Sequence, residues 1–179
     1  MELISLDFLN SDWRDWRGSG RHENRLEKAD WLEWFLAKWD LPADLSAIRD
    51  VRDLTLFRDS LRTIVEYTVA GEPLRDADIA FFNEALQPYS SYPQLSRTEN
   101  GLQLTQVSAL NGWPYVTARI ALDLAELLAK GDLRRLKMCD NSDCRWIFYD
   151  QSRNRAARWC DDKCCGNLMK VRRFRKKNK

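Results

Sequence analysis

The chain has 179 residues, of which 44% are hydrophobic and 31% charged, and a formal net charge of +2. This length suffices for one hydrophobic core, because a domain of this size removes about 70% of its unfolded surface from water. No apolar run approaches the roughly 18 residues of a membrane span, and the first residues do not resemble a signal peptide, so we expect a cytoplasmic protein with no membrane partner.

Residues 1–133 predict a mainly helical domain, because four segments carry apolar residues at helical spacing. The first segment runs from about Leu26 to Trp39, and the second ends before Gly71-Glu72-Pro73, a strong stop signal. Asp76 is suited to cap the third helix, and Pro114 suits the first turn of the fourth. The apolar positions are Trp31, Trp34, Phe35, Trp39, Leu54, Phe57, Leu61, Ile64, Val65, Ile79, Phe82, Leu86, Ile120, Leu124, Leu127 and Leu128.

Between the third and fourth helices the pattern changes. Residues 92–107 read as two short strands around Glu99-Asn100-Gly101, and Asn-Gly favours a tight hairpin turn. We therefore expect a small β-hairpin within the helical domain.

Five of the eight tryptophans lie before residue 40. Aromatic residues at helical spacing usually belong to a core. A second interpretation is an apolar pocket for a small-molecule effector, with Trp13, Arg14, Trp16, Arg17 and Arg21 near its mouth. No residue identifies such a ligand.

All five cysteines follow Met138, in the order Cys139-x4-Cys144, fifteen residues, Cys160-x4-Cys165. Two short pairs separated by roughly 12 to 20 residues can place four sulfurs around a tetrahedral Zn²⁺ ion. Disulfides are typical of secreted chains, and this charged segment has too few large apolar residues to fold without a metal. We therefore predict one structural zinc ion, and disulfides, free thiols or another metal are the alternatives.

The fifth cysteine, Cys164, directly precedes Cys165. Neighbouring residues at the start of a helix point about 100° apart, so both thiols are not expected to reach one metal. We choose Cys165 as the ligand. Cys164 is then either a small buried filler or an oxidisable thiol.

The residues around the cysteines predict a knuckle, a hairpin and a second knuckle that opens a helix, the order of a treble-clef-like finger. Residues 145–149 are β-prone, residues 150–154 favour a turn, and residues 158–159 would form the returning strand. Downstream, an apolar stripe recurs at helical spacing and is expected to pack on Trp146 or Phe148. The stripe consists of Leu168, Val171 and Phe174.

The distribution of charge divides the chain near residue 133, just before the segment that contains the cysteines. Residues 134–179 hold 15 Lys and Arg against 5 Asp and Glu, whereas residues 1–133 hold 14 against 22. Such a basic density suits phosphate neutralisation with release of counterions, and the alternative is a solvated tail or one docked on the acidic half. The candidate nucleic-acid contacts are Arg153, Arg155, Arg158, Lys170, Arg172, Arg173, Arg175, Lys176 and Lys177.

Residues 137–175 resemble the CGNR zinc finger in their cysteine spacing, the intervening RWIFYD and SRN, the CGN after Cys164, and KVRRFR. Upstream, LDFLNS at residues 6–11 and the helical region after it resemble the ABATE domain that precedes this finger in many bacterial proteins. The resemblance implies a stress-induced transcription regulator, with a sensor domain at 1–133 and a finger at 134–179. Leu168 stands where the family finger has its name-giving Arg.

Three functions follow from these features. The first is a DNA-binding regulator whose helical domain senses a ligand or mediates homodimerisation, since a short finger usually needs a partner to gain specificity. The second is an RNA-binding or protein-interaction module that uses the same basic surface. The third is a small-molecule enzyme in the helical domain, which we do not expect, because the chain has one histidine, His22, and no phosphate loop or nucleophile elbow.

Overall fold

The computed structural model describes residues 2–48, 50–87, 89, 91–99, 101–108 and 111–178. Helices dominate, and the strands in this part of the chain form three separate two-stranded antiparallel sheets. The predicted helical fold with a small hairpin is therefore confirmed, and two further short sheets accompany it. No helix among the residues searched is long and apolar enough to cross a membrane.

The helices and strands follow one another along the chain with short 3-10 turns between some of them. Their order is α1 (Ile4–Leu9), β1 (Asp12–Arg14), β2 (His22–Asn24), η1 (Arg25–Glu27), α2 (Ala29–Lys38), η2 (Leu45–Ala47), α3 (Val51–Ala70), α4 (Asp76–Leu86), β3 (Ser91–Thr98), β4 (Gly101–Ser108), α5 (Gly112–Lys130), η3 (Leu133–Arg135), β5 (Leu136–Met138), β6 (Ile147–Tyr149), the π-helical η4 (Asp162–Gly166) and α6 (Asn167–Lys177).

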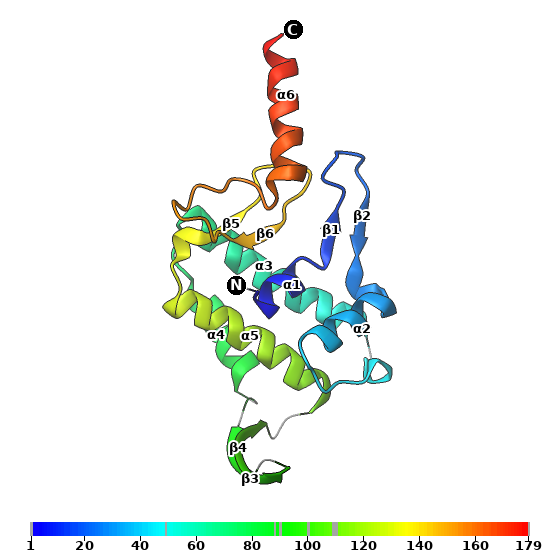
Figure 1. Cartoon of the computed structure of the whole chain (residues 1–179), viewed down its shortest axis with the longest axis vertical. Helices are drawn as coiled ribbons and strands as arrows, with labels where there is room; N and C mark the ends of the chain where they lie inside the picture. Colours follow the sequence, from blue (N-terminus) through cyan, green and yellow to red (C-terminus); the bar gives the residue numbers. More distant parts are fainter. Residues whose placement is uncertain are drawn as a thin grey trace.

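The short helix α1 lies in the middle of the molecule and contacts α3, α5 and β6 (Figure 1). Phe8 and Leu9 are fully buried there, and the Phe8 ring lies 6.0 Å from that of Phe35 in α2. The N-terminal end of α1 is tied to α5, because Ser5 donates from its backbone N and its Oγ to Asp123 Oδ2, at 3.1 and 2.5 Å. The LDFLNS segment is thus the centre of the core.

Helix α3 ends as the sequence predicts, directly before Gly71. Asp50 caps α3 by accepting from the Arg52 backbone N at 2.8 Å, and Gly71 closes it with a positive φ of 80° that a residue with a side chain rarely adopts. In α4 the predicted cap is wrong: Asp76 is the first helical residue. Asp78 instead binds the free N–H at the helix start, accepting from the Arg75 backbone N at 3.0 Å.

The predicted hairpin is confirmed as β3–β4, with Leu95 opposite Leu104. Asn100, the first residue of the predicted Asn-Gly turn, lies outside the described residues. The hairpin stands at the end of the molecule opposite α6 (Figure 1). Leu95, Leu102 and Leu104 on it are exposed.

The finger is joined to the helical part through a common core. Residues 147–149 form β6, but its partner is β5 and not residues 158–159, so the predicted returning strand is wrong. The reason is burial: pairing with β5 places Leu136 and Ile147 in the same hydrophobic cluster as α1, α3 and α5. Arg158 instead accepts a single backbone hydrogen bond, from Asp140 N at 2.9 Å.

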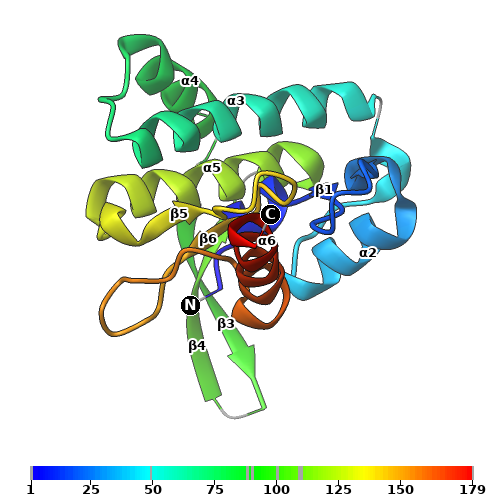
Figure 2. The ribbon, with the colours of Figure 1, turned by 90° about the horizontal axis from the view of Figure 1, so that it is seen from above.

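Helix α6 projects from the body, over the middle of the helical part, and carries the C-terminus at its tip (Figures 1 and 2). Its apolar stripe does not pack on Trp146 or Phe148 as predicted, since Val171 is 46% and Phe174 68% exposed. Trp146 packs against the cysteines instead.

Candidate metal centre and nucleic-acid interface

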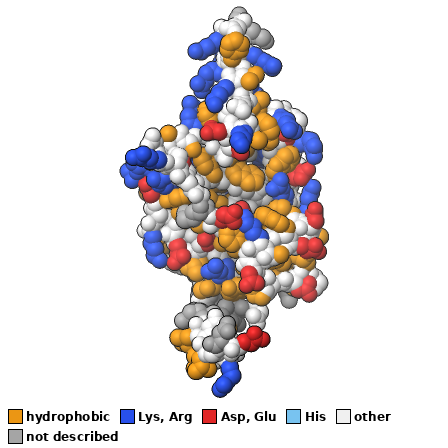
Figure 3. Space-filling view, in the orientation of Figure 1, with side chains coloured by type: hydrophobic (Ala, Val, Ile, Leu, Met, Phe, Trp, Pro, Cys, Tyr) orange, Lys and Arg blue, Asp and Glu red, His pale blue; other side chains and the backbone are white. Residues whose placement is uncertain are grey.

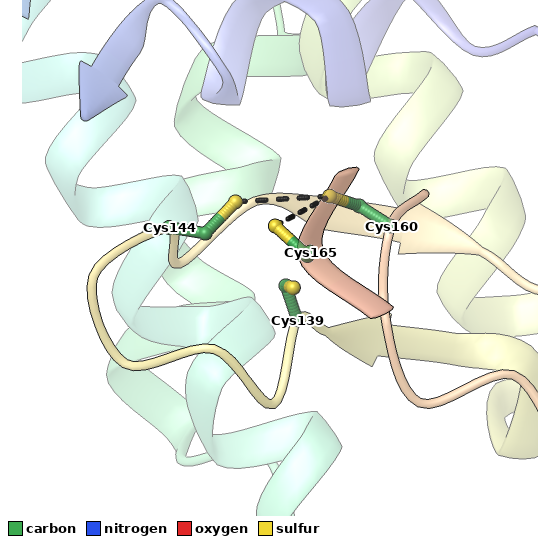
Figure 4. Close-up of side chains that lie close together, drawn as sticks. All are labelled: Cys139, Cys144, Cys160 and Cys165. Carbon is green, nitrogen blue, oxygen red and sulfur yellow. Dashed lines mark hydrogen bonds between the residues drawn. The ribbon is translucent and has the colours of Figure 1, made fainter. Parts of the chain in front are cut away.

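Four cysteines from two separate knuckles meet at the base of α6. The Sγ atoms of Cys139, Cys144, Cys160 and Cys165 all lie within 4.8 Å of one another (Figure 4). The distance is 3.7 Å from Cys144 Sγ to Cys160 Sγ and 3.9 Å from Cys160 Sγ to Cys165 Sγ. These separations are far longer than a disulfide bond of about 2.05 Å.

The same distances fit a zinc ion. Four Zn–S bonds of about 2.3 Å in a tetrahedron place the sulfurs about 3.8 Å apart. The four predicted ligands therefore form a site that holds one Zn²⁺ ion, and a closed set of four thiolates supplies folding energy rather than an open position for substrate. Cys164 is not part of the cluster.

Four ionised thiols so close together would repel one another without a cation between them. Hydrogen bonding to Cys139 raises the pKa of Cys144 to about 12 and also raises the pKa of Cys160, whereas hydrogen bonds from Cys144 and Cys160 lower the pKa of Cys139. Once one sulfur is ionised, its neighbours resist losing their protons. A divalent cation at the centre offsets this repulsion by binding all four thiolates.

Aromatic and amide side chains enclose the cysteines. Trp16, Trp146 and Trp159 pack against the cluster. The fully buried Asn141 donates from Nδ2 to the Trp16 carbonyl oxygen at 2.8 Å and lies 3.5 Å from Cys165 Sγ. A residue from the N-terminal hairpin thus becomes part of the metal site's surroundings.

The backbone of the finger is held by a buried amide from α1's C-terminal end. Asn10 Oδ1 accepts from Ile147 N at 2.9 Å, and Asn10 Nδ2 donates to Ile147 O at 2.8 Å. Asn10 is 3% exposed, so both bonds are shielded from water. The Asn of the LDFLNS segment therefore fixes β6 relative to the helical core.

A second link joins α3 to the first knuckle. Arg145 has a positive φ of 53°, its guanidinium donates to Glu66 Oε1 at 2.7 Å, and its carbonyl accepts from Arg62 Nη1 at 3.3 Å. Arg62 is buried and lies 3.7 Å from Asp12 Oδ2. Burial opposes ionisation of Asp12, but a hydrogen bond from His22 and the charge of Arg62 outweigh it, so the pKa of Asp12 is lowered.

Asp150 holds the loop between the two cysteine pairs, residues 145–159, in place by hydrogen bonds. This buried carboxylate accepts from Lys137 Nζ at 2.7 Å and from the backbone N of Ser152 and Ala157 at 2.8 and 3.0 Å. Burial alone would raise the pKa of Asp150, but the Lys137 and Ser152 hydrogen bonds lower it well below the usual value. The loop therefore keeps its shape without strands.

The predicted nucleic-acid contacts divide into paired and unpaired cations. Three arginines are held by carboxylates: Arg155 by Asp132 at 3.2 Å, Arg158 by Asp140 at 2.6 Å and Arg172 by Asp143 at 2.7 Å. The others have no ion-pair partner within the described ranges: Arg153, Lys170, Arg173, Arg175, Lys176 and Lys177. On the face shown in Figure 3, Lys and Arg side chains lie along α6 at its end of the molecule.

Arg172 differs from the other cations of α6, because it contacts two other parts of the protein. Its Nη2 donates to the Arg17 carbonyl at 2.9 Å while its Nη1 reaches Asp143. The loop between β1 and β2 comes so close that a Cβ on Gly18 would lie 2.7 Å from Arg172 Nη2. Arg172 thus fastens α6 to that loop.

A small groove of about 250 Å³ lies beside α6. Arg158, Trp159, Arg173 and Lys176 are among its lining residues. The indole Nε1 of Trp159 is buried and has no hydrogen-bond partner. The groove therefore combines cations with one carboxylate, Asp140, which is paired with Arg158.

The candidate effector residues of the N-terminal segment do not line the two cavities described here. Trp16 packs on the cysteine cluster with the Arg17 guanidinium 4.8 Å from its ring, and Trp13 lies in β1 with Arg21 at 5.9 Å. Arg14 Nε is 3.5 Å from Asp12 Oδ2. None of Trp13, Arg14, Trp16 and Arg17 lines either cavity described here.

Sequence reasoning missed Asn10, Asn141, Arg62 and Arg145 as supports of the metal site. The available signals were the LDFLNS segment, which contains Asn10, and the RWIFYD segment, which begins at Arg145. The others are ordinary polar residues whose roles depend on contacts more than 80 residues away in the chain or on burial that spacing does not show.

Two family models match the chain in succession. The ABATE model, described as "Putative stress-induced transcription regulator", matches residues 3–131, and the CGNR zinc finger model matches residues 135–178. A search of curated proteins found no match. The chain therefore belongs to the ABATE family and carries a CGNR zinc finger at its C-terminal end.

Proposed function

We propose that the protein is a DNA-binding transcription regulator, acting under stress in the cytoplasm, whose finger and α6 contact duplex DNA. One observation carries the proposal: α6 has six Lys and Arg and no acidic residue, and five of the six have no ion-pair partner within the described part of the chain. Unpaired cations on one projecting element are what phosphate neutralisation requires.

The dimensions of α6 suit a groove of DNA. Its 11 residues make a helix about 16 Å long, and the major groove of B-DNA, about 12 Å wide, admits an α-helix. The zinc site and the Arg172 contacts anchor the base of α6, so its cations are presented in a fixed direction. A fixed direction reduces the ordering cost of binding.

The groove beside α6 gives the same surface a place for a phosphate. Arg173 and Lys176 line it and have no ion-pair partner within the described residues, so an oxygen of the DNA backbone could lie between them.

The helical part would then serve as the regulatory unit, sensing an effector or mediating homodimerisation. For the finger we propose binding rather than catalysis, since the thiolate set leaves no open position on the metal. Reduced thiols also suit a reducing compartment such as the cytoplasm.

The test compares two charge-matched triple variants of the zinc-loaded chain. One replaces Lys170, Arg173 and Lys176 with Gln, and the control replaces Arg52, Arg97 and Lys130 with Gln. Fluorescence anisotropy with a labelled 30-base-pair duplex is recorded over a range of salt concentrations. We expect steep salt dependence in the wild type and the control, and a slope reduced by about two to three in the α6 variant, because each phosphate contact contributes about 0.9.

Three results would overturn the assignment. They are no binding to duplex at low salt, an equal loss in the control variant, and tighter binding to a structured RNA or an acidic peptide than to the duplex. The last would favour the interaction-module hypothesis.

A further inference from the structure

A cavity of about 790 Å³ opens in the helical part, away from the finger. It lies where the N-terminal half of α3, the end of α4, the η2 turn and the start of α5 meet. Its volume is within the roughly 300–1,000 Å³ of small-molecule sites. The cavity is open to solvent and large enough to admit a small molecule.

Aromatic rings form much of the lining. Phe57 and Phe81 line the cavity with their ring centroids 5.7 Å apart, and Trp113 lines it from α5. Trp113 Nε1 donates to the Asp44 carbonyl at 3.0 Å, so the polar atom of the indole is already satisfied. The ring therefore offers an apolar and cation-attracting surface.

The charged residues of the lining are all acidic. Asp50, Asp53 and Glu84 line the cavity, and none of the described lining residues is Lys, Arg or His. Asp50 is already paired with Arg52, whose Nε lies 2.7 Å from its Oδ2. Asp53 and Glu84 have no ion-pair partner within the described ranges.

Glu84 is also at a position that the fold does not favour for a carboxylate. It lies in the last turn of α4, at the negative end of the helix dipole, and that turn contains no basic residue. Asp53 lies in the first turn of α3, where a carboxylate stabilises the helix. Helix stability therefore explains Asp53 but not Glu84.

We propose that this cavity binds a small organic cation, with its apolar body against Phe57, Phe81 and Trp113 and its ammonium group beside Glu84 and Asp53. This assigns a chemical class to the effector of the regulatory role proposed above and rests on that role only for its biological meaning. Binding itself is measured without DNA, so the two proposals can fail separately.

The experiment uses three probes with one apolar body and different charge: 4-phenylbutylamine, 4-phenyl-1-butanol and 4-phenylbutyrate. Their affinities for the full zinc-loaded chain are measured by isothermal titration calorimetry. We expect the amine to bind about tenfold more tightly than the alcohol, as an ion pair and a cation–π contact together allow, and the carboxylate most weakly.

Two variants locate the site. Glu84→Gln should remove most of the preference for the amine over the alcohol, and Ala85→Leu, which fills the cavity, should weaken both probes. Glu72→Gln, an exposed carboxylate in the loop after α3, is the matched control and should change nothing. Equal affinity for the three probes, a preference for the carboxylate, no binding of any probe, or a Glu84→Gln protein that keeps the amine preference would overturn the proposal.

Discussion

At the scale of single residues, Asn10 shows how a side chain can replace a strand. Its amide offers one donor and one acceptor, and both pair with the backbone of Ile147, as a neighbouring strand would. An Asp here could only accept when ionised and would leave the Ile147 carbonyl without a donor. The amide is therefore specific to this contact.

Asn10→Ala should lower the free energy of unfolding by about 2–4 kcal/mol, because two buried backbone groups lose their partners. Urea unfolding of the zinc-loaded protein measures the change. Asn167→Ala is the matched control: its Nδ2 also donates to a backbone carbonyl, of Lys163 at 3.1 Å, but at an exposed site, so a loss within about 0.5 kcal/mol is expected. Equal losses in the two variants would show that the Asn10 bonds contribute nothing special.

The burial of Arg58 and Arg62 is not predicted by sequence patterns. They lie on α3 among apolar positions, and both are buried. Arg58 Nη1 donates to Asn24 Oδ1 at 2.7 Å, and Arg62 reaches Asp12 and the Arg145 carbonyl. Spacing alone assigns such residues to a solvated face, because their partners come from distant segments.

At the scale of elements, the spacing of apolar residues predicted the helices and strands that are long enough to show a period. The helices α2 to α5 and the β3–β4 hairpin were predicted because each is long enough to show its period. The three-residue strands β1, β2 and β5 are too short for a pattern, so they were missed. The stripe on α6 was found but its packing was wrong, since three apolar residues among six cations cannot offset the cost of burying their neighbours.

The spacing of the cysteines gave the metal site more directly than any other feature. The angle between neighbouring residues predicted that only one of the adjacent Cys164 and Cys165 binds the metal. Cys165 was chosen, and the structure places it in the cluster. What spacing could not show is the enclosure by Trp16 and Asn141, because it depends on the β1–β2 loop reaching the knuckle.

Cys144→Ser should reduce the zinc content from one ion per chain to well below one, because a hydroxyl is a poor replacement for a thiolate ligand. Native mass spectrometry and metal analysis of purified protein measure it. Cys164→Ser, which changes a thiol just outside the cluster, should keep one ion. Zinc retained in full by the first variant, or lost by the second, would contradict the assignment of the four ligands.

At the scale of the whole molecule, the two segments matched by family models do not have separate cores. Leu136 and Ile147, on the finger side of the boundary, are buried in one hydrophobic cluster with Phe8 of α1. Asn10 and the Arg145–Glu66 ion pair add polar links across the same boundary. Removing either side would expose apolar surface on the other, so the two are expected to fold together.

The chain should therefore unfold in one cooperative transition. In a urea titration, far-UV circular dichroism follows the helices and a chromophoric zinc indicator follows the metal site, and the two curves should share one midpoint. Ile147→Ala removes buried methyl groups from the common core and should cost about 2–5 kcal/mol, shifting both curves together. Zinc release at clearly lower urea than the loss of helix, or a variant that shifts only the zinc curve, would mean that the finger unfolds independently of the helical part.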